Sequence, residues 1–144
     1  MANRSEVKST DAGTETNGMK KKVLASSKAA LPMGPYSQGI QVGNLIFVAG
    51  EKGIDPKTDK VVPGGIMAET RQTFENIKAI LEQAGATLDD AVSSTVHMTD
   101  LKEFQDMNKV YAEYIHKAPP GRTTVQVAAL PGGAHIEITI IAAV

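Results

Sequence analysis

Residues 135–141 read His-Ile-Glu-Ile-Thr-Ile-Ile, a stretch in which polar and apolar side chains alternate. Side chains of a β-strand point to its two faces in turn, so this stretch predicts a strand with two different faces. One face carries Ile136, Ile138 and Ile140, which belong in a core. The other carries His135, Glu137 and Thr139. A carboxylate such as Glu137 is then either a functional group or part of a face that meets water.

The preceding apolar segment, residues 123–130, is predicted to pair with residues 135–142 as a hairpin that sets Ala128 opposite Glu137. Three residues of this segment would then share the face of Glu137: Thr124, Gln126 and Ala128. In the same register Arg122 lies about 20 Å along the strand from Glu137. If both residues act on one small substrate, the site must lie between subunits of a closed ring.

The chain from Val23 onward predicts two helices among several strands. Apolar residues recur at three- and four-residue steps over residues 67–84, and Gly85 supplies a helix stop. A second helix follows a capping box, with an apolar face of Phe104, Met107, Tyr111 and Tyr114. The other strands are expected over residues 39–42, 45–49, 61–62 and 91–98. This order predicts one α+β domain over residues 23–144, with a mixed sheet of about six strands covered on one face by two helices.

Residues 1–22 are expected to form a disordered N-terminal extension, because residues 1–18 carry hardly an apolar side chain. Lysine and arginine number 15 against 16 acidic residues, so we expect no nucleic-acid or membrane partner. The absence of cysteine excludes disulfides and thiolate chemistry. No apolar run reaches the ~20 residues of a membrane span, and we expect a cytoplasmic protein.

Arg122 follows Pro119-Pro120-Gly121, a stiff loop that can present the planar guanidinium to a carboxylate. Taken alone, it is equally an ordinary exposed arginine at the start of a strand. The histidines have no metal-ligand spacing, so we expect no metal and each is assigned a structural or exposed position: His97, His116 and His135.

Four motifs together resemble, in order and spacing, the Rid (YjgF) family of imine deaminases. They are Gly34-Pro35-Tyr36-Ser37-Gln38, Gly43-Asn44 before a buried strand, Pro120-Gly121-Arg122-Thr123 and Ile136-Glu137-Ile138. The likeness extends from about Ser26 to the C-terminus. It implies a chorismate-mutase-like fold and a homotrimer whose sites lie between subunits.

The resemblance also implies roles for particular residues. Arg122 would bind the substrate carboxylate, while Tyr36, Asn108 and Glu137 would line the pocket. Ala49 and Thr124 are also expected among the substrate-binding residues. Glu137 would lie near the hydrolytic water and act as a general base. The implied reaction needs no cofactor, and it converts a small 2-imino or enamino carboxylic acid, such as 2-aminoacrylate, to a 2-keto acid and ammonia.

Three positions depart from the usual pattern of the family. Ala49 stands where a serine is usual, Thr124 where a cysteine is frequent, and Glu51 where glutamine is common. Two further functions therefore stay open: a catabolic deaminase of the 2-aminomuconate type, and a non-catalytic module that binds a small carboxylate. An endoribonuclease is less favoured because the chain carries no net positive charge.

Overall fold

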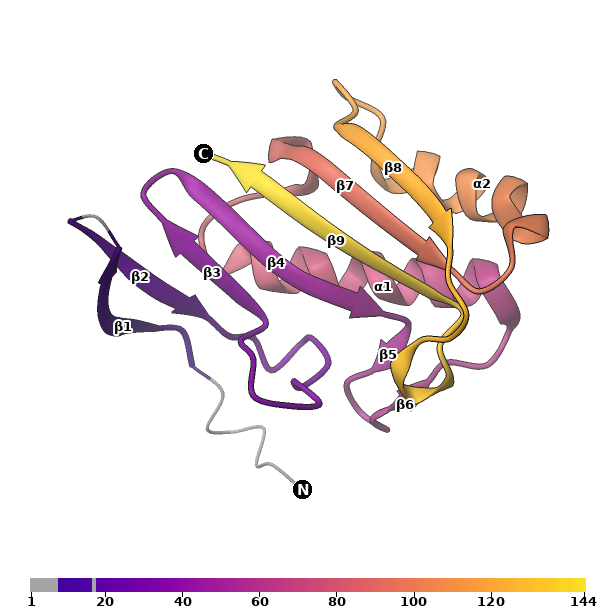
Figure 1. Ribbon diagram of the computed structural model, residues 1–144, viewed down its shortest axis with the longest axis horizontal. Coiled ribbons are helices and arrows are strands. Elements are labelled where there is room, and N and C mark those ends of the chain that lie inside the picture. Colours follow the sequence, from indigo (N-terminus) through magenta and orange to yellow (C-terminus); the bar gives the residue numbers. More distant parts are fainter. Residues whose placement is uncertain (1–7, 17) are drawn as a thin grey trace.

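The fold is given by a computed structural model that describes residues 8–16 and 18–144, in which two helices lie behind a curved sheet (Figure 1). The strands are β1 (Thr10–Thr16), β2 (Met19–Leu24), β3 (Gly39–Val42), β4 (Leu45–Lys52), β5 (Ile54–Asp55), β6 (Lys60–Val61), β7 (Ala91–Met98), β8 (Gly121–Gln126) and β9 (Ile136–Ala143). The α-helices are α1 (Gly65–Glu82) and α2 (Phe104–Tyr114). The α+β class and the two helices on one face of a mixed sheet are confirmed.

The main sheet has seven strands in the order β1-β2-β3-β4-β9-β7-β8 (Figure 1). Neighbouring strands are antiparallel except β7 and β8, which run parallel. Strands β5 and β6 form a separate two-stranded ribbon. As a result β9, the last strand in sequence, lies in the middle of the sheet between β4 and β7.

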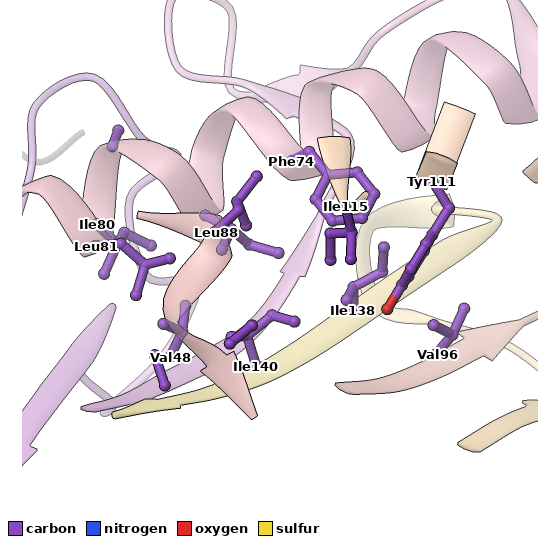
Figure 2. Close-up of a cluster of buried hydrophobic side chains, with 14 of the residues drawn as sticks. Val48, Phe74, Ile80, Leu81, Leu88, Val96, Tyr111, Ile115, Ile138 and Ile140 are labelled. Atoms are coloured by element: carbon purple, nitrogen blue, oxygen red, sulfur yellow. The ribbon is translucent and has the colours of Figure 1, made fainter. Parts of the chain in front are cut away.

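The core lies between this sheet and helix α1. Left-handed backbone at Gly64 and Gly65 (φ 114° and 80°) turns the chain into the helix, close to the start predicted from periodicity. Figure 2 shows Phe74 of α1 and Tyr111 of α2 over the sheet, and their rings meet edge to face with centroids 5.3 Å apart. The helices thus bury one face of the sheet and leave the other open.

Strand β9 has the two faces that its alternation predicts. Ile136, Ile138 and Ile140 are buried against the helices, whereas Glu137 and Thr139 lie half-buried on the open face. Lys52 of β4 is the register partner of Glu137 on one side, and His97 of β7 is its partner on the other.

The predicted hairpin between residues 123–130 and 135–142 is wrong. Strand β8 pairs in parallel with β7, and β7 separates it from β9. The physical reason is helix α2, which carries the chain back so that β7, α2 and β8 form a β-α-β unit. Thr124 is register partner of the buried Val96, so Thr124 faces the helices and not the face of Glu137.

The N-terminal segment also differs from its prediction. Within the extension expected to be disordered, β1 and β2 pair with each other, and β2 pairs with β3 from Lys21 to Leu24. Backbone groups at the edge of a sheet can accept a further strand whatever its side chains are, which composition does not reveal. Residues 1–7 and 17 lie outside the described residues. No helix in the described ranges is long and apolar enough to span a bilayer.

Candidate functional site

Three of the predicted site residues line one pocket on the open side of the sheet. Tyr36, Ala49 and Glu137 surround a space of about 410 Å³. The remaining lining residues are Met33, Gly50, Lys52 and Pro131. The pocket therefore combines apolar walls with one ammonium, one carboxylate and one phenol, a composition that fits a small polar molecule.

Tyr36 is held by a loop that the buried side chain of Gln38 ties together. Gln38 Oε1 accepts a hydrogen bond from the N–H of Ser26 (2.6 Å), and its Nε2 donates to the carbonyl of Ala30 (2.7 Å). The Tyr36 hydroxyl accepts a hydrogen bond from the N–H of Met33 (2.8 Å). The ring is thus fixed at the mouth of the pocket by the backbone of its own loop.

Glu137 is paired with Lys52 across the two central strands. The Lys52 Nζ lies 3.4 Å from Glu137 Oε2, and the two side chains are 7% and 20% exposed. A β-bulge between Val48 and Glu51 shifts the register and brings Lys52 opposite Glu137. Lys52 was not among the predicted site residues, because its contact with Glu137 depends on this bulge.

Gly50, within the bulge, leaves room for the carboxylate. A Cβ atom at this position would lie 2.7 Å from Cδ and 2.8 Å from Oε1 of Glu137. Any side chain at position 50 would therefore move the Glu137 carboxylate from its place.

His97 approaches Glu137 from the opposite side to Lys52. Its Nδ1 lies 3.8 Å from Glu137 Oε1, and this buried nitrogen has no hydrogen-bond partner among the described residues. His97 was predicted to be structural or exposed. It alternates with the buried Val96 and Met98, and this alternation indicates that its side chain lies on the open face, as that of Glu137 does.

Glu51 precedes Lys52 and is a buried carboxyl that faces the helix side, since its register partner is the buried Ile138. Burial raises its pKa from the ordinary 4.5 to about 8, while the Lys52 ammonium opposes this shift and the Glu137 carboxylate adds to it. Glu51 is therefore mostly protonated at neutral pH. A protonated carboxyl offers one donor and one acceptor, as the amide of glutamine does, so Glu51 can replace glutamine here without adding a charge.

Arg122 lies on the other side of the sheet, packed against helix α2. Its guanidinium carbon is 4.6 Å from the centre of the Tyr111 ring and 5.6 Å from that of Phe104. Asn108 lies four residues after Phe104 and three before Tyr111, so it shares their face of α2. Thr124, two residues after Arg122, points to the same side and has a buried hydroxyl without a hydrogen-bond partner in the described chain.

One chain does not bring the two groups of predicted site residues together. Arg122, Asn108 and Thr124 lie on the helix side, and Glu137 lies on the open side. Arg122 and Glu137 are also two strands and three register positions apart, about 14 Å between backbones. The separation of about 20 Å expected from the hairpin was wrong. A site between subunits, which was inferred from that separation, is nevertheless compatible with the observed register.

In the described part of the chain, no three or more His, Cys, Asp or Glu side chains are grouped so that they could hold a metal ion. The ionisable side chains of the described residues that meet at the pocket wall include Glu137, Lys52 and His97, and Arg122 lies across the sheet.

Comparison with known proteins places this arrangement in a family. The model of the family described as endoribonuclease L-PSP matches residues 26–144. A RutC family protein of Pyrococcus abyssi is 51% identical over 124 residues, which cover 86% of this chain and 98% of that protein. The mouse 2-iminobutanoate/2-iminopropanoate deaminase is 39% identical over 122 residues, covering 85% of this chain and 90% of that one.

A solved structure shows the same fold. The crystal structure of RidA from an Antarctic Psychrobacter superposes with a TM-score of 0.82 at 41% identity, and the match covers 85% of this chain and 98% of that one. The resemblance found in four short motifs thus extends over the whole domain, and the chain belongs to the endoribonuclease L-PSP family, which includes the Rid (YjgF) and RutC proteins.

Proposed function

We propose that the chain hydrolyses small 2-imino acids, such as 2-iminobutanoate and 2-iminopropanoate, to 2-keto acids and ammonia without a cofactor. The observation that carries this proposal is the partly buried Glu137 carboxylate, which is fixed by Lys52 at the wall of a pocket. The mouse relative is named for the same reaction at 39% identity, which supports the assignment.

Arg122 is suited to hold the carboxylate of the substrate. Its guanidinium carbon lies 4.6 Å from the centre of the Tyr111 ring and 5.6 Å from that of Phe104, and these cation–π contacts limit its movement. A carboxylate in the plane of a guanidinium accepts two parallel hydrogen bonds. These two hydrogen bonds would hold the imine carbon at a constant position relative to Glu137, the proposed base.

The reaction then needs a water molecule and one carboxylate. In the protonated imine, water attacks the electrophilic carbon, a C–O bond forms, and Glu137 takes one proton from the water. Glu137 returns this proton to the amino nitrogen, and the remaining hydroxyl proton follows as the C–N bond breaks. The products are the 2-keto acid and ammonium, so the atoms and charge of imine and water are conserved.

The proposed site lies between subunits of a homotrimer. Arg122 of one subunit would face Glu137 of the next, because a single chain sets them on opposite faces of its sheet. The open face carries large apolar side chains that a second copy could cover: Leu45, Phe47 and Val125. Threefold closure would then create three equivalent sites.

The test uses the purified full chain with 2-iminobutanoate generated in situ from the amino acid by an amino-acid oxidase. We expect formation of 2-ketobutanoate to exceed the spontaneous rate at least about tenfold, and Glu137→Gln to remove most of the acceleration. Imine loss at the spontaneous rate would contradict the proposal.

A non-catalytic binding module is the second candidate, favoured by the ion pair that already engages Glu137. Binding of 2-ketobutanoate at the pocket with no acceleration of imine hydrolysis would identify it. We do not propose RNA as substrate despite the family's description, because a net charge of −1 gives no long-range attraction to a polyanion.

A further inference from the structure

The Glu137 carboxylate has a different neighbour at each oxygen. Oε2 lies 3.4 Å from the Lys52 ammonium, and Oε1 lies 3.8 Å from Nδ1 of His97. Gly50 borders Oε1 so closely that it has no space for a Cβ atom. These three residues come from the strands on both sides of β9, so the sheet itself confines the carboxylate.

The position of Lys52 differs from that of the lysines on the helices. Lys78 and Lys109 form ion pairs within exposed helix surfaces, with side chains 44% and 69% exposed. Lys52 is almost fully buried, and a buried ammonium strongly destabilises the fold unless an anion compensates it. Glu137 is that anion, so the fold holds the two groups together far more strictly than a surface ion pair would.

We propose that Lys52 and His97 are positioning residues that fix Glu137 as the base of the reaction, an inference that rests on the proposed hydrolase function. Lys52 holds Oε2 through the ion pair at 3.4 Å. His97 and the backbone at Gly50 confine Oε1, which is left as the oxygen that takes the proton from water. The three residues thereby give the base one orientation at the pocket wall.

The ionisable groups around Glu137 are Lys52 and Glu51 from β4 and His97 from β7. Burial raises the pKa of Glu51 to about 8, so Glu51 is mostly protonated at neutral pH. Experiments below this pKa therefore test the contact of Lys52 with Glu137 without a charge on Glu51.

The first experiment compares Lys52→Met with Lys52→Arg on 2-iminobutanoate. We expect the methionine variant to lower kcat roughly tenfold to a hundredfold, because a base displaced by about 1 Å loses this much. KM should change much less, since Lys52 is not the carboxylate anchor. The arginine variant keeps the cation and should recover part of kcat, and Lys78→Met is the matched control that keeps parent kinetics.

The same variants separate positioning from folding. A purely structural role for Lys52 would lower the amount of folded enzyme, measured by circular dichroism, and leave kcat per folded subunit unchanged in both variants.

His97 is tested by His97→Phe and His97→Asn, with His116→Phe as the matched control at an exposed histidine. Phenylalanine keeps the ring and removes both nitrogens, whereas asparagine retains a polar atom near Nδ1. We expect kcat to fall several-fold to tenfold in the phenylalanine variant and less in the asparagine variant. Parent kcat in both variants would exclude His97 from the positioning of Glu137.

A measurement independent of turnover separates this inference from the proposed function. The carboxyl resonance of Glu137, in protein labelled with ¹³C-glutamate, is assigned by its loss in Glu137→Gln and compared at one pH between the parent and Lys52→Met. We expect its chemical shift to change in the variant, because the carboxylate loses its contact with Lys52. An inactive parent with this change contradicts only the hydrolase, whereas an unchanged resonance overturns the role of Lys52 whatever the activity is.

Discussion

Arg122 and Glu51 show how one residue's surroundings decide its chemistry. The guanidinium of Arg122 lies close to two aromatic rings, and these contacts hold its position beside α2. Glu51 is buried, and burial raises its pKa so that it is mostly uncharged at neutral pH. The first residue is suited to hold an anion, and the second is a neutral carboxyl whose Oε1 has no hydrogen-bond partner among the described residues.

Arg122→Lys should lower kcat/KM for 2-iminobutanoate at least about tenfold while assembly stays intact. Lysine keeps the charge but loses the planar two-point contact, and a charge-assisted pair contributes ~1.5–3 kcal/mol. Steady-state kinetics together with size-exclusion chromatography measure both effects. Arg71→Lys, at an exposed arginine paired with Glu113, is the matched control. Parent-like kcat/KM in the Arg122 variant would remove Arg122 as the carboxylate anchor.

Glu51→Gln should stabilise the protein more at pH 8 than at pH 5. The folded pKa of about 8 lies above the ordinary 4.5, so between these values the folded state keeps a proton that the unfolded state has lost. The free energy of unfolding of the parent therefore falls as pH rises through this window, by about 1.4 kcal/mol per pH unit. The glutamine side chain does not titrate, so the free energy of unfolding of the variant does not fall in this way as pH rises.

Urea unfolding of the parent and of Glu51→Gln at several pH values in this window measures the difference. We expect the advantage of the variant to grow steadily with pH. A difference that is constant with pH would show that the Glu51 carboxyl is not protonated in the folded state.

At the scale of elements, α1 approaches the end of β4 so closely that Gly53 must lack a side chain. A Cβ atom there would lie 2.6 Å from Cα and 2.7 Å from the carbonyl oxygen of Glu69, both atoms of the helix backbone. Glu69 is itself anchored, since its carboxylate accepts a hydrogen bond from the N–H of His135 (2.9 Å) and contacts His135 Nδ1 (2.6 Å). The helix therefore has little freedom to move away.

Gly53→Ala should lower the free energy of unfolding by about 1–3 kcal/mol, the usual effect of forcing atoms into a packed contact. Gly121→Ala is the control, because a Cβ atom there meets its nearest neighbour, the carbonyl oxygen of Val92, at 4.0 Å. Urea unfolding curves of the two variants measure their free energies of unfolding. Equal values would show that α1 can move away from position 53 without a loss of stability.

The elements differ in how far the sequence predicted them, for identifiable reasons. Helix α1 and strand β9 carry complete periodic patterns of apolar residues, and each was located correctly. The pairing of β8 was predicted wrongly, because the sequence of residues 123–130 fits a local hairpin as well as it fits the crossover that α2 creates. Sequence alternation fixes the faces of a strand, whereas its neighbours depend on the packing of distant elements.

The same distinction applies to the candidate site. Glu137 and Arg122 were named because a carboxylate in an apolar strand and an arginine after two prolines are unusual locally. Lys52 and His97 were not predicted as site residues, because their contacts with Glu137 depend on how β4 and β7 are aligned with β9. The roles of the predicted site residues stay predictions until the variants are measured.

For the whole molecule, we expect light scattering to give a mass of three copies of the 15.2 kDa chain. Phe47→Asp should reduce that mass and the activity together, because a charge on the half-exposed apolar face cannot be buried between subunits without a large penalty. A stable monomer with parent activity would contradict an intersubunit site.

The central place of β9 has a consequence for the order in which the molecule is built. Strands β4 and β7 emerge from the ribosome well before residues 136–143, yet each has β9 as its neighbour in the sheet. Until β9 arrives, both present unpaired strand edges, the usual starting point of aggregation. Hydrogen exchange during refolding should therefore show that those amides of β4 and β7 that point toward β9 become protected only together with β9. During synthesis, chains that still lack β9 should depend most on chaperones.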